Sequence, residues 1–250
     1  LGASTIVITT GFDNRDVFES VRQLVDRGAE ALLLVGEVQD ARLRDYLRQS
    51  QIPVVTTYSS PPDRSVPSVG FDNYMATAGA IDYLIGLGHR EFAMIAGSTA
   101  GNDRQQARIA AYRDMIAKAG ANGKDRVYCH EFEMRGGANV MKQILRDHPE
   151  TTAVICNSDV FAIGAMSACR KLGLRVPEDI SIVGCDDFDF AELLEPPLTT
   201  IAVPAAEMGA IAAQALWEAV ARQRPVVAQD VATRLVVRGS TAPPGAWNVT

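Results

Sequence analysis

Short apolar runs alternate with amphipathic stretches along nearly the whole chain. Apolar runs of this kind are typical of strands that are buried on both faces of a parallel sheet. We expect strands at residues 5–9, 31–36, 52–57, 69–71, 91–97, 127–130, 153–156, 180–184 and 231–238. The intervening stretches carry apolar residues at helical spacing. They predict helices at residues 17–26, 40–50, 72–87, 103–119, 137–148, 159–172 and 205–222.

Residues 152–204 form a predicted strand–helix–strand unit with polar residues directly after both of its strands. Polar groups at the carboxyl ends of parallel strands are where open α/β folds bind ligands. The unit has five such residues just after its two strands, and we expect them to face one crevice: Asn157, Ser158, Asp159, Asp186 and Asp187. The first three can equally serve only to cap the helix that follows, because each accepts hydrogen bonds from free N–H groups.

The regular alternation of strand and helix predicts the α/β class with parallel sheets. The strands are too numerous for one mononucleotide-binding half. A barrel is possible by count, but the long loops do not repeat evenly along the chain. Two doubly wound lobes with a ligand cleft between them fit the pattern better.

Composition limits the classes of partner that this chain can have. The formal net charge is −6 and 22% of the residues are charged. The chain therefore lacks the basic excess of a nucleic-acid-binding domain. No apolar run approaches the ~18 residues that a membrane span needs, and no signal peptide is visible. We expect neither membrane association nor direct DNA contact by these residues.

The four cysteines stand alone in the sequence, at positions 129, 156, 169 and 185. No C-x-x-C pair suggests a zinc site or a redox centre. Isolated cysteines within apolar runs behave as small core residues. We expect buried free thiols and a reducing, cytoplasmic location.

The usual motifs of catalysis and cofactor binding are absent. Neither G-x-G-x-x-G nor G-x-x-x-x-G-K-[ST] follows a strand, and no G-x-S-x-G elbow occurs. The three histidines have no partner at metal-ligand spacing. Asp186, Asp187 and Asp189 could bind magnesium, but one ligand-binding carboxylate and two acids that cover a turn explain them equally. We expect no enzyme activity, no cofactor and no metal.

Arg104 and Arg108 lie one turn apart near the start of a predicted helix. They could form a solvated basic face. Alternatively, Arg108 could turn into the cleft, where its planar guanidinium can bind two hydroxyls or a carboxylate. Aromatic residues near strand and helix ends could stack on a sugar or simply pack: Tyr58, Tyr74, Phe132 and Phe188.

The sequence also contains a series of motifs in a fixed order. They are IGLGHR at 85–90, Arg108 four residues before Tyr112, SDVFAIGA at 158–165, GLRVPEDISIVG at 173–184, Asp186-Asp187, PPLTTI at 196–201 and RGST at 238–241. In this order the chain resembles the effector-binding domain of the lactose-repressor/galactose-repressor (LacI/GalR) family of bacterial transcriptional regulators. The resemblance extends over essentially the whole chain.

The resemblance implies a type I periplasmic-binding-protein-like fold with two lobes joined by three crossovers. The expected lobes are residues 1–88 with 204–232, and residues 89–203 with 233–250. It also implies a dimer that binds a small molecule, commonly a sugar, between the lobes. By the family pattern, Asp186 accepts ligand hydroxyl protons and Arg108 is the cleft arginine. The remaining expected contacts are Ser158, Asn157, Phe132 and Tyr74.

Three departures from the family pattern stand out. Ser158 occupies a position where Asn is frequent. Members usually begin with a helix-turn-helix headpiece, and this chain shows none. By the family pattern, we also expect the chain to begin at the second strand of the first lobe. DNA binding is therefore expected of a parent protein through its headpiece rather than of these residues.

The resemblance predicts a ligand-sensing domain whose effector changes the operator affinity of a dimer. A rival interpretation is a periplasmic sugar-binding protein of a transporter, which shares the fold as a monomer. Another is a Rossmann-type enzyme that uses a nucleotide or a metal. The unpaired cysteines and the PPLTTI segment argue against the transporter protein, and the absent phosphate loops argue against the enzyme.

Overall fold

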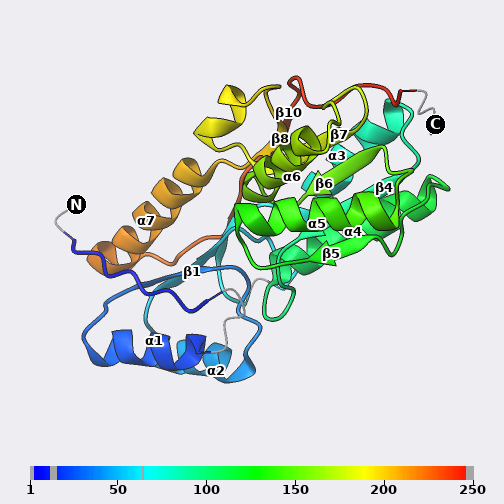
Figure 1. Ribbon diagram of the computed structural model, residues 1–250. Helices are drawn as coiled ribbons and strands as arrows, with labels where there is room; N and C mark the ends of the chain where they lie inside the picture. Colours follow the sequence, from blue (N-terminus) through cyan, green and yellow to red (C-terminus); the bar gives the residue numbers. More distant parts are fainter. Residues whose placement is uncertain (1–2, 12–15, 64, 246–250) are drawn as a thin grey trace. The chain divides into compact units, whose positions relative to one another are not determined.

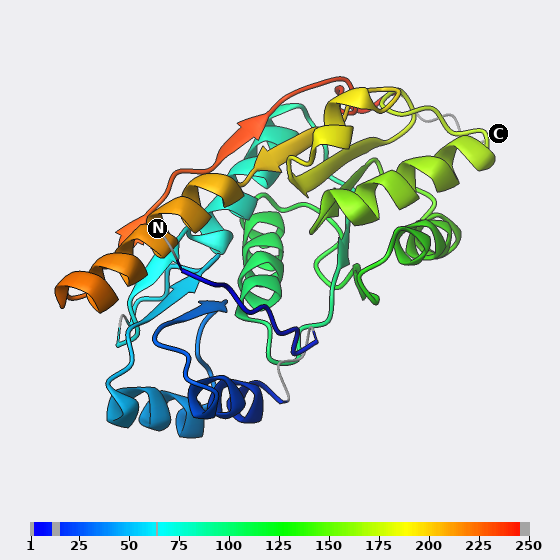
Figure 2. The same cartoon turned by 90° about the vertical axis from the view of Figure 1, so that its left-hand side faces the viewer.

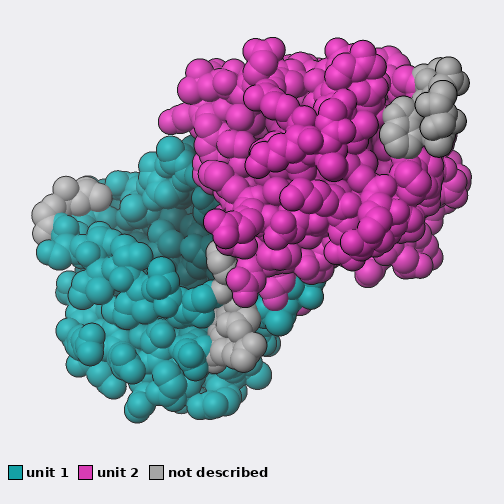
Figure 3. Space-filling view, viewed as in Figure 1, with its two compact units in different colours: residues 1–73, 99–104, 204–232 teal, residues 74–98, 105–203, 233–250 magenta. Residues whose placement is uncertain are grey.

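The computed structural model describes residues 3–11, 16–63 and 65–245. The chain forms two compact units (Figure 3). Unit 1 comprises residues 1–73, 99–104 and 204–232, and unit 2 comprises residues 74–98, 105–203 and 233–250. The predicted α/β class with parallel sheets is confirmed in both units.

Unit 1 is built on a four-stranded parallel sheet. Its strands are in the order β1 (Leu32–Val35), β2 (Val54–Thr57), β3 (Ser68–Gly70) and β9 (Gln229–Asp230). Helices α1 (Val17–Asp26) and α2 (Ala41–Ser50) lie on one side of this sheet, and α7 (Ala205–Arg222) lies on the other (Figures 1 and 2). The apolar faces of α1 and α2 meet around Val21, Leu43 and Leu47. This burial explains their amphipathic sequence pattern.

Unit 2 is built on a six-stranded sheet. The strand order is β10 (Arg234–Val236), β8 (Thr199–Ala202), β7 (Ser181–Asp186), β6 (Ala153–Cys156), β4 (Phe92–Ala96) and β5 (Val127–Cys129). Only β10 runs antiparallel to its neighbour. The central strands are buried on both faces, as their continuous apolar runs predict.

The remaining helices belong almost entirely to unit 2. They are α3 (Asn73–Gly86), α4 (Asp103–Lys118), α5 (Met134–Asp147), α6 (Asp159–Lys171) and the short 3-10 helix η1 (Asp189–Leu193). The core of this unit joins strand residues such as Ile95 and Val154 to helix residues such as Ile144 and Phe161. None of the helices in the described part of the chain is long and apolar enough to cross a membrane.

The two units differ from the expected lobes in two places. Residues 74–88 were expected in the first lobe, but they pack within unit 2. There, Tyr83 on α3 bonds to Thr241 through their hydroxyls, 2.9 Å apart. Residues 99–104 were expected in the second lobe, but they pack within unit 1, where Ser59 donates a hydrogen bond to Asp103.

Two strand predictions are wrong. Residues 5–9 form no strand, and Ile6 and Val7 are 67% and 82% exposed. An apolar run becomes a strand only where a neighbouring strand pairs with its backbone groups, and the described sheet of unit 1 provides no such partner for it. The run 231–238 was expected to be one strand. Instead, β9 ends before it, in the sheet of unit 1, and β10 covers only its middle, in the sheet of unit 2.

The cysteine prediction is correct for three of the four thiols. Cys156, Cys169 and Cys185 are buried and free, and burial raises the pKa of each thiol. Cys129 is free but exposed, contrary to expectation. It ends β5, the edge strand of its sheet, where a side chain has fewer neighbours to cover it.

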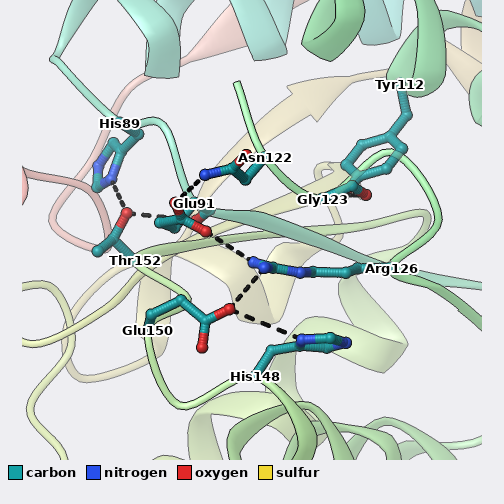
Figure 4. A network of polar contacts seen from close by, with 9 residues as sticks. All are labelled: His89, Glu91, Tyr112, Asn122, Gly123, Arg126, His148, Glu150 and Thr152. Atoms are coloured by element: carbon teal, nitrogen blue, oxygen red, sulfur yellow. Dashed lines mark hydrogen bonds and ion pairs between the residues drawn. The ribbon is translucent and has the colours of Figure 1, made fainter. Parts of the chain in front are cut away.

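A polar network closes the amino-terminal edge of the unit 2 sheet (Figure 4). Arg126 pairs with Glu91 at 2.9 Å and with Glu150 at 2.5 Å. His89 is 1% exposed, and its Nδ1 lies 2.9 Å from the hydroxyl of Thr152. Burial lowers the pKa of this histidine. The network lies at the edge opposite to the one predicted to bind ligand, and it joins the segments that precede β4, β5 and β6.

Helices α5 and α6 lie side by side (Figures 1 and 2), and their backbones approach closely at Gly164. A Cβ atom at Gly164 would lie 2.0 Å from the carbonyl oxygen of Met134 and 2.8 Å from the amide nitrogen of Ala138. Both neighbours are backbone atoms, so neither can move away by changing a rotamer. Glycine at this position sets the distance between the two helices.

We predict that Gly164→Ala destabilises the fold by about 1–3 kcal/mol, because overpacking forces the helix backbones apart. Gly79→Ala is the matched control, since Gly79 is exposed on α3 with open space around it. That change should stabilise by about 0.5–1 kcal/mol, the usual gain for alanine within a helix. Urea unfolding of both variants measures the difference. Equal stabilities for the two variants would contradict the close approach.

Candidate functional site

The carboxyl edge of the unit 2 sheet contains a topological switch point. The chain leaves β4 for β5 on one side of it and then returns to β6 on the other side. Loops that diverge from adjacent strand ends leave a crevice between them, and ligands of open α/β sheets bind there. The residues that immediately follow β4 and β6 are Gly97 and Asn157. Asp186 ends β7, the next strand along.

The register of β6 and β7 explains why two predicted site residues meet. Ile155 lies opposite Val183 in this parallel pair, so the same register brings Ser158 beside Asp186. The Ser158 hydroxyl donates a hydrogen bond to Oδ2 of Asp186 at 2.7 Å. It also accepts from the backbone N–H of Val160 at 3.2 Å and so caps α6. Ser158 therefore both caps α6 and contacts Asp186, the carboxylate that is predicted to bind ligand.

Arg108 is turned inward rather than onto a solvated face. It is 5% exposed, and its Nη1 donates to the backbone carbonyl of Asn157 at 2.7 Å. Arg104, one turn earlier on α4, packs in unit 1, where its Nη1 lies 3.2 Å from Oδ1 of Asp103. The i, i+4 spacing of Arg104 and Arg108 could not show that the two arginines lie in different surroundings. The structure joins Arg108 to the strand end that carries Asn157.

Gln105 is a further candidate site residue, which the sequence pattern did not indicate. Its Oε1 accepts from the backbone N–H of Gly97 at 3.0 Å and from Nδ2 of Asn157 at 2.8 Å. The side chain thereby joins the ends of β4 and β6 at the switch point. Its position one turn before Arg108, on the same face of α4, is the signal that could have identified it.

The carboxyl of Asp186 has a strongly raised pKa. Burial raises the pKa of its carboxyl to about 6, although the charge of Arg108 and the hydrogen bond from Ser158 act in the opposite direction. Its φ of 122° and the φ of 58° at Asp187 are positive. Such angles are strained in non-glycine residues, at about 1–3 kcal/mol each. Surrounding contacts must therefore hold this turn.

The neighbouring acids have structural roles. Asp187 pairs with Arg238 at 2.7 Å, and Asp189 begins η1. The described residues contain no cluster of three or more His, Cys, Asp or Glu that could hold a metal ion. Asp159 was expected to face the crevice, but its buried carboxylate is bonded on one oxygen to Thr200 and on the other to Phe188. It is the first residue of α6 and lies beneath the turn, because its carboxylate bonds to the backbone N–H of Phe188.

The two predicted aromatic contacts lie in different surroundings. Phe132 is half-buried and packs edge-to-face on Phe161, with ring centroids 5.4 Å apart. This contact fits the packing interpretation of its sequence position. Tyr74, in the first turn of α3, donates its hydroxyl proton to Asp114 on α4 at 3.0 Å. The described contacts that connect Arg108, Asn157, Ser158 and Asp186 involve neither ring.

We predict that Asp186→Asn stabilises the domain increasingly as the pH rises from about 4 to 6. A carboxyl whose pKa is raised on folding binds its proton more tightly in the folded state. Its presence therefore costs stability as the pH rises from the unfolded pKa to the folded one. Above pH 7 the gain in the variant should reach up to about 3 kcal/mol.

Urea unfolding of the wild type and the variant at pH 4, 6 and 7.5 measures this difference. Asp82→Asn is the control, because Asp82 is exposed on α3. That substitution should change the free energy of unfolding by less than about 0.5 kcal/mol, as exposed substitutions usually do. A pH-independent effect of Asp186→Asn would contradict the burial of its charge.

Comparison with known proteins identifies the family to which the fold and this edge belong. The family model of the periplasmic binding protein-like domain matches residues 81–241. The HTH-type transcriptional repressor CytR of Escherichia coli (strain K12) is 31% identical over 222 residues, which cover 87% of this chain and 64% of the repressor. The chain thus spans 64% of the length of CytR and of the ribose operon repressor of Haemophilus influenzae, less than two thirds of either relative.

Solved structures give the same result. A LacI family transcriptional regulator from Mycobacterium smegmatis is 32% identical with a TM-score of 0.76, and the match covers 91% of this chain and 84% of that one. A complex of the transcriptional regulator CelR with cellobiose is 29% identical with a TM-score of 0.79, covering 91% of this chain and 71% of that one. The chain therefore belongs to the LacI family of transcriptional regulators and contains the periplasmic binding protein-like domain.

Proposed function

We propose that this domain senses a small polyhydroxylated molecule, such as a sugar or a sugar derivative. The ligand binds at the carboxyl edge of the unit 2 sheet. Arg108 and Asp186 supply its main polar contacts, with Asn157 and Ser158 beside them. The observation that carries the proposal is the group of buried polar contacts at the switch point. Arg108 is anchored on the carbonyl of Asn157, and the next residue, Ser158, is bonded to Asp186.

The chemistry of this edge favours hydroxyl groups on the ligand. A carboxylate accepts protons from hydroxyls, and a guanidinium donates to their oxygens. Asp186 and Arg108 are close enough for the arginine charge to lower the pKa of the carboxyl. With both groups ionised near pH 7, their charges largely cancel. A neutral polyol fits such a pair better than an anion or a cation does.

The relatives support a regulatory rather than a transport function. CytR is a transcriptional repressor, and the CelR structure is a complex with cellobiose. We propose by analogy that the full-length protein acts as a dimer on operator DNA through a headpiece, in the cytoplasm. Ligand would change operator affinity by binding one conformation better than the other. The binding of ligand by two lobes, including Phe132 and Tyr74, stays a prediction of the family resemblance.

We predict that a thermal-shift screen against sugars, sugar acids and nucleosides finds a ligand among the neutral polyols. A ligand present at about 100 times its Kd stabilises the folded state by about 2.7 kcal/mol. Affinity for that ligand should fall at least about tenfold in Arg108→Ala and in Asp186→Asn, because each change removes a charged hydrogen-bonding partner.

Arg113→Ala is the matched control for Arg108→Ala, since Arg113 is exposed on the same helix. It should bind the ligand as the wild type does. In the full-length protein, the same ligand should change the affinity for operator DNA, and Asp186→Asn should abolish that response. Undiminished ligand affinity in both site variants would exclude this edge as the binding site.

A further inference from the structure

The turn that carries Asp186 has a strained backbone, and contacts from neighbouring elements must hold it in place. Asp186 and Asp187 both have positive φ angles, which residues other than glycine rarely adopt. Ser158 holds the Asp186 carboxylate from the start of α6, and Arg238 holds Asp187 from the segment after β10. Neither contact fixes the backbone as it leaves the turn. That backbone is bonded at Phe188, whose N–H donates to Oδ2 of Asp159 at 2.9 Å.

We propose that Asp159 is a positioning residue for ligand binding: its buried carboxylate holds the turn 186–188 in the conformation that presents the Asp186 carboxylate. The inference rests on the proposed function of Asp186. Asp159 itself is 0% exposed. Both oxygens of its carboxylate are bonded to Thr200 and Phe188, so it acts on a ligand through the turn and not by touching it.

The Asp159 carboxylate has a partner on each oxygen. Oδ1 accepts from the hydroxyl of Thr200 on β8 at 2.6 Å, and Oδ2 accepts from Phe188 after β7. Asp159 lies in the first turn of α6, where the positive end of the helix dipole also favours an anion. The side chain thus connects the start of α6 to Thr200 within β8 and to the loop that follows β7.

Gly184 provides the space that this carboxylate occupies. A Cβ atom at position 184 would lie only 2.1 Å from Oδ1 of Asp159. Any other residue there would displace the carboxylate from its place between β7 and β8. The glycine in the strand and the buried acid in the helix therefore form one arrangement, although they are far apart in the sequence.

The charge of Asp159 affects the pKa of Asp186, and this effect can be measured without a ligand. The charged and titratable groups that act on the Asp186 carboxyl are Arg108, Asp159 and Cys185, and Ser158 donates a hydrogen bond to it. The negative charge of Asp159 contributes to the raised pKa of Asp186. Removing that charge without moving the turn should therefore lower the pKa of Asp186.

Two substitutions separate positioning from charge. In Asp159→Asn, the amide oxygen can accept from the Phe188 N–H and the amide nitrogen can donate to Thr200, so the turn should persist. Asp159→Ala leaves the Phe188 N–H without its partner and should release the turn. Asp189→Asn is the matched control, because Asp189 is an exposed acid three residues beyond Asp186.

The experiment is NMR of the ligand-free domain. Carboxyl carbon shifts report the pKa of Asp186, and amide hydrogen exchange reports the Phe188 N–H. We expect Asp159→Asn to lower the Asp186 pKa below its wild-type value of about 6 while Phe188 stays protected. Asp159→Ala should speed Phe188 exchange by about tenfold or more, in line with the loss of a charged hydrogen bond. Asp189→Asn should change neither value.

Binding measurements complete the test with whichever neutral sugar the thermal-shift screen identifies. Asp159→Ala should weaken its binding at least about tenfold, and Asp159→Asn should restore most of the affinity. The proposal is overturned if Asp159→Asn leaves the Asp186 pKa unchanged, or if Asp159→Ala leaves Phe188 protected. Because both readouts are made without ligand, they remain decisive if no sugar binds, which would contradict the proposed function alone.

Discussion

The buried carboxylate of Asp159 is the contact on which the carboxyl edge of unit 2 depends. A buried charge is tolerated only where hydrogen bonds replace its hydration. Asp159 obtains these bonds from Thr200 on β8 and from the backbone N–H of Phe188, at a helix N-terminus. Its bonds in turn join α6 to the loop after β7. The same edge carries Ser158 and Asp186. The buried Asp159 and the proposed ligand-binding Asp186 therefore belong to one group of connected residues.

The topology of the sheet explains why polar side chains converge there. The strands on either side of the switch point, β4 and β6, send their chains in opposite directions. Gln105 bridges their ends through Gly97 and Asn157, and Arg108 is bonded to Asn157 from the same helix. These contacts fix the backbone before any ligand arrives. Preorganised polar groups lose little conformational freedom on binding, which favours affinity for a small ligand.

Much of this arrangement could be predicted from the sequence. The apolar runs gave the central strands of unit 2 because both faces of those strands are buried. Asn157, Ser158 and Asp186 followed from their place directly after such runs. The run at 5–9 failed because apolarity predicts burial only where a neighbouring strand exists. Gln105 and the buried role of Asp159 depend on contacts between distant segments, which no local pattern records.

The carboxyl edge of the unit 2 sheet is where we propose that ligand binds. Hydrogen–deuterium exchange of the domain, with and without a stabilising sugar, tests this proposal most directly. Binding should slow exchange at unit 2 residues 97–98, 105–108, 157–160 and 185–188. The amino-terminal edge around Glu91, Arg126 and Glu150 should be unaffected. Protection confined to that amino-terminal edge, or to unit 1, would contradict the proposal.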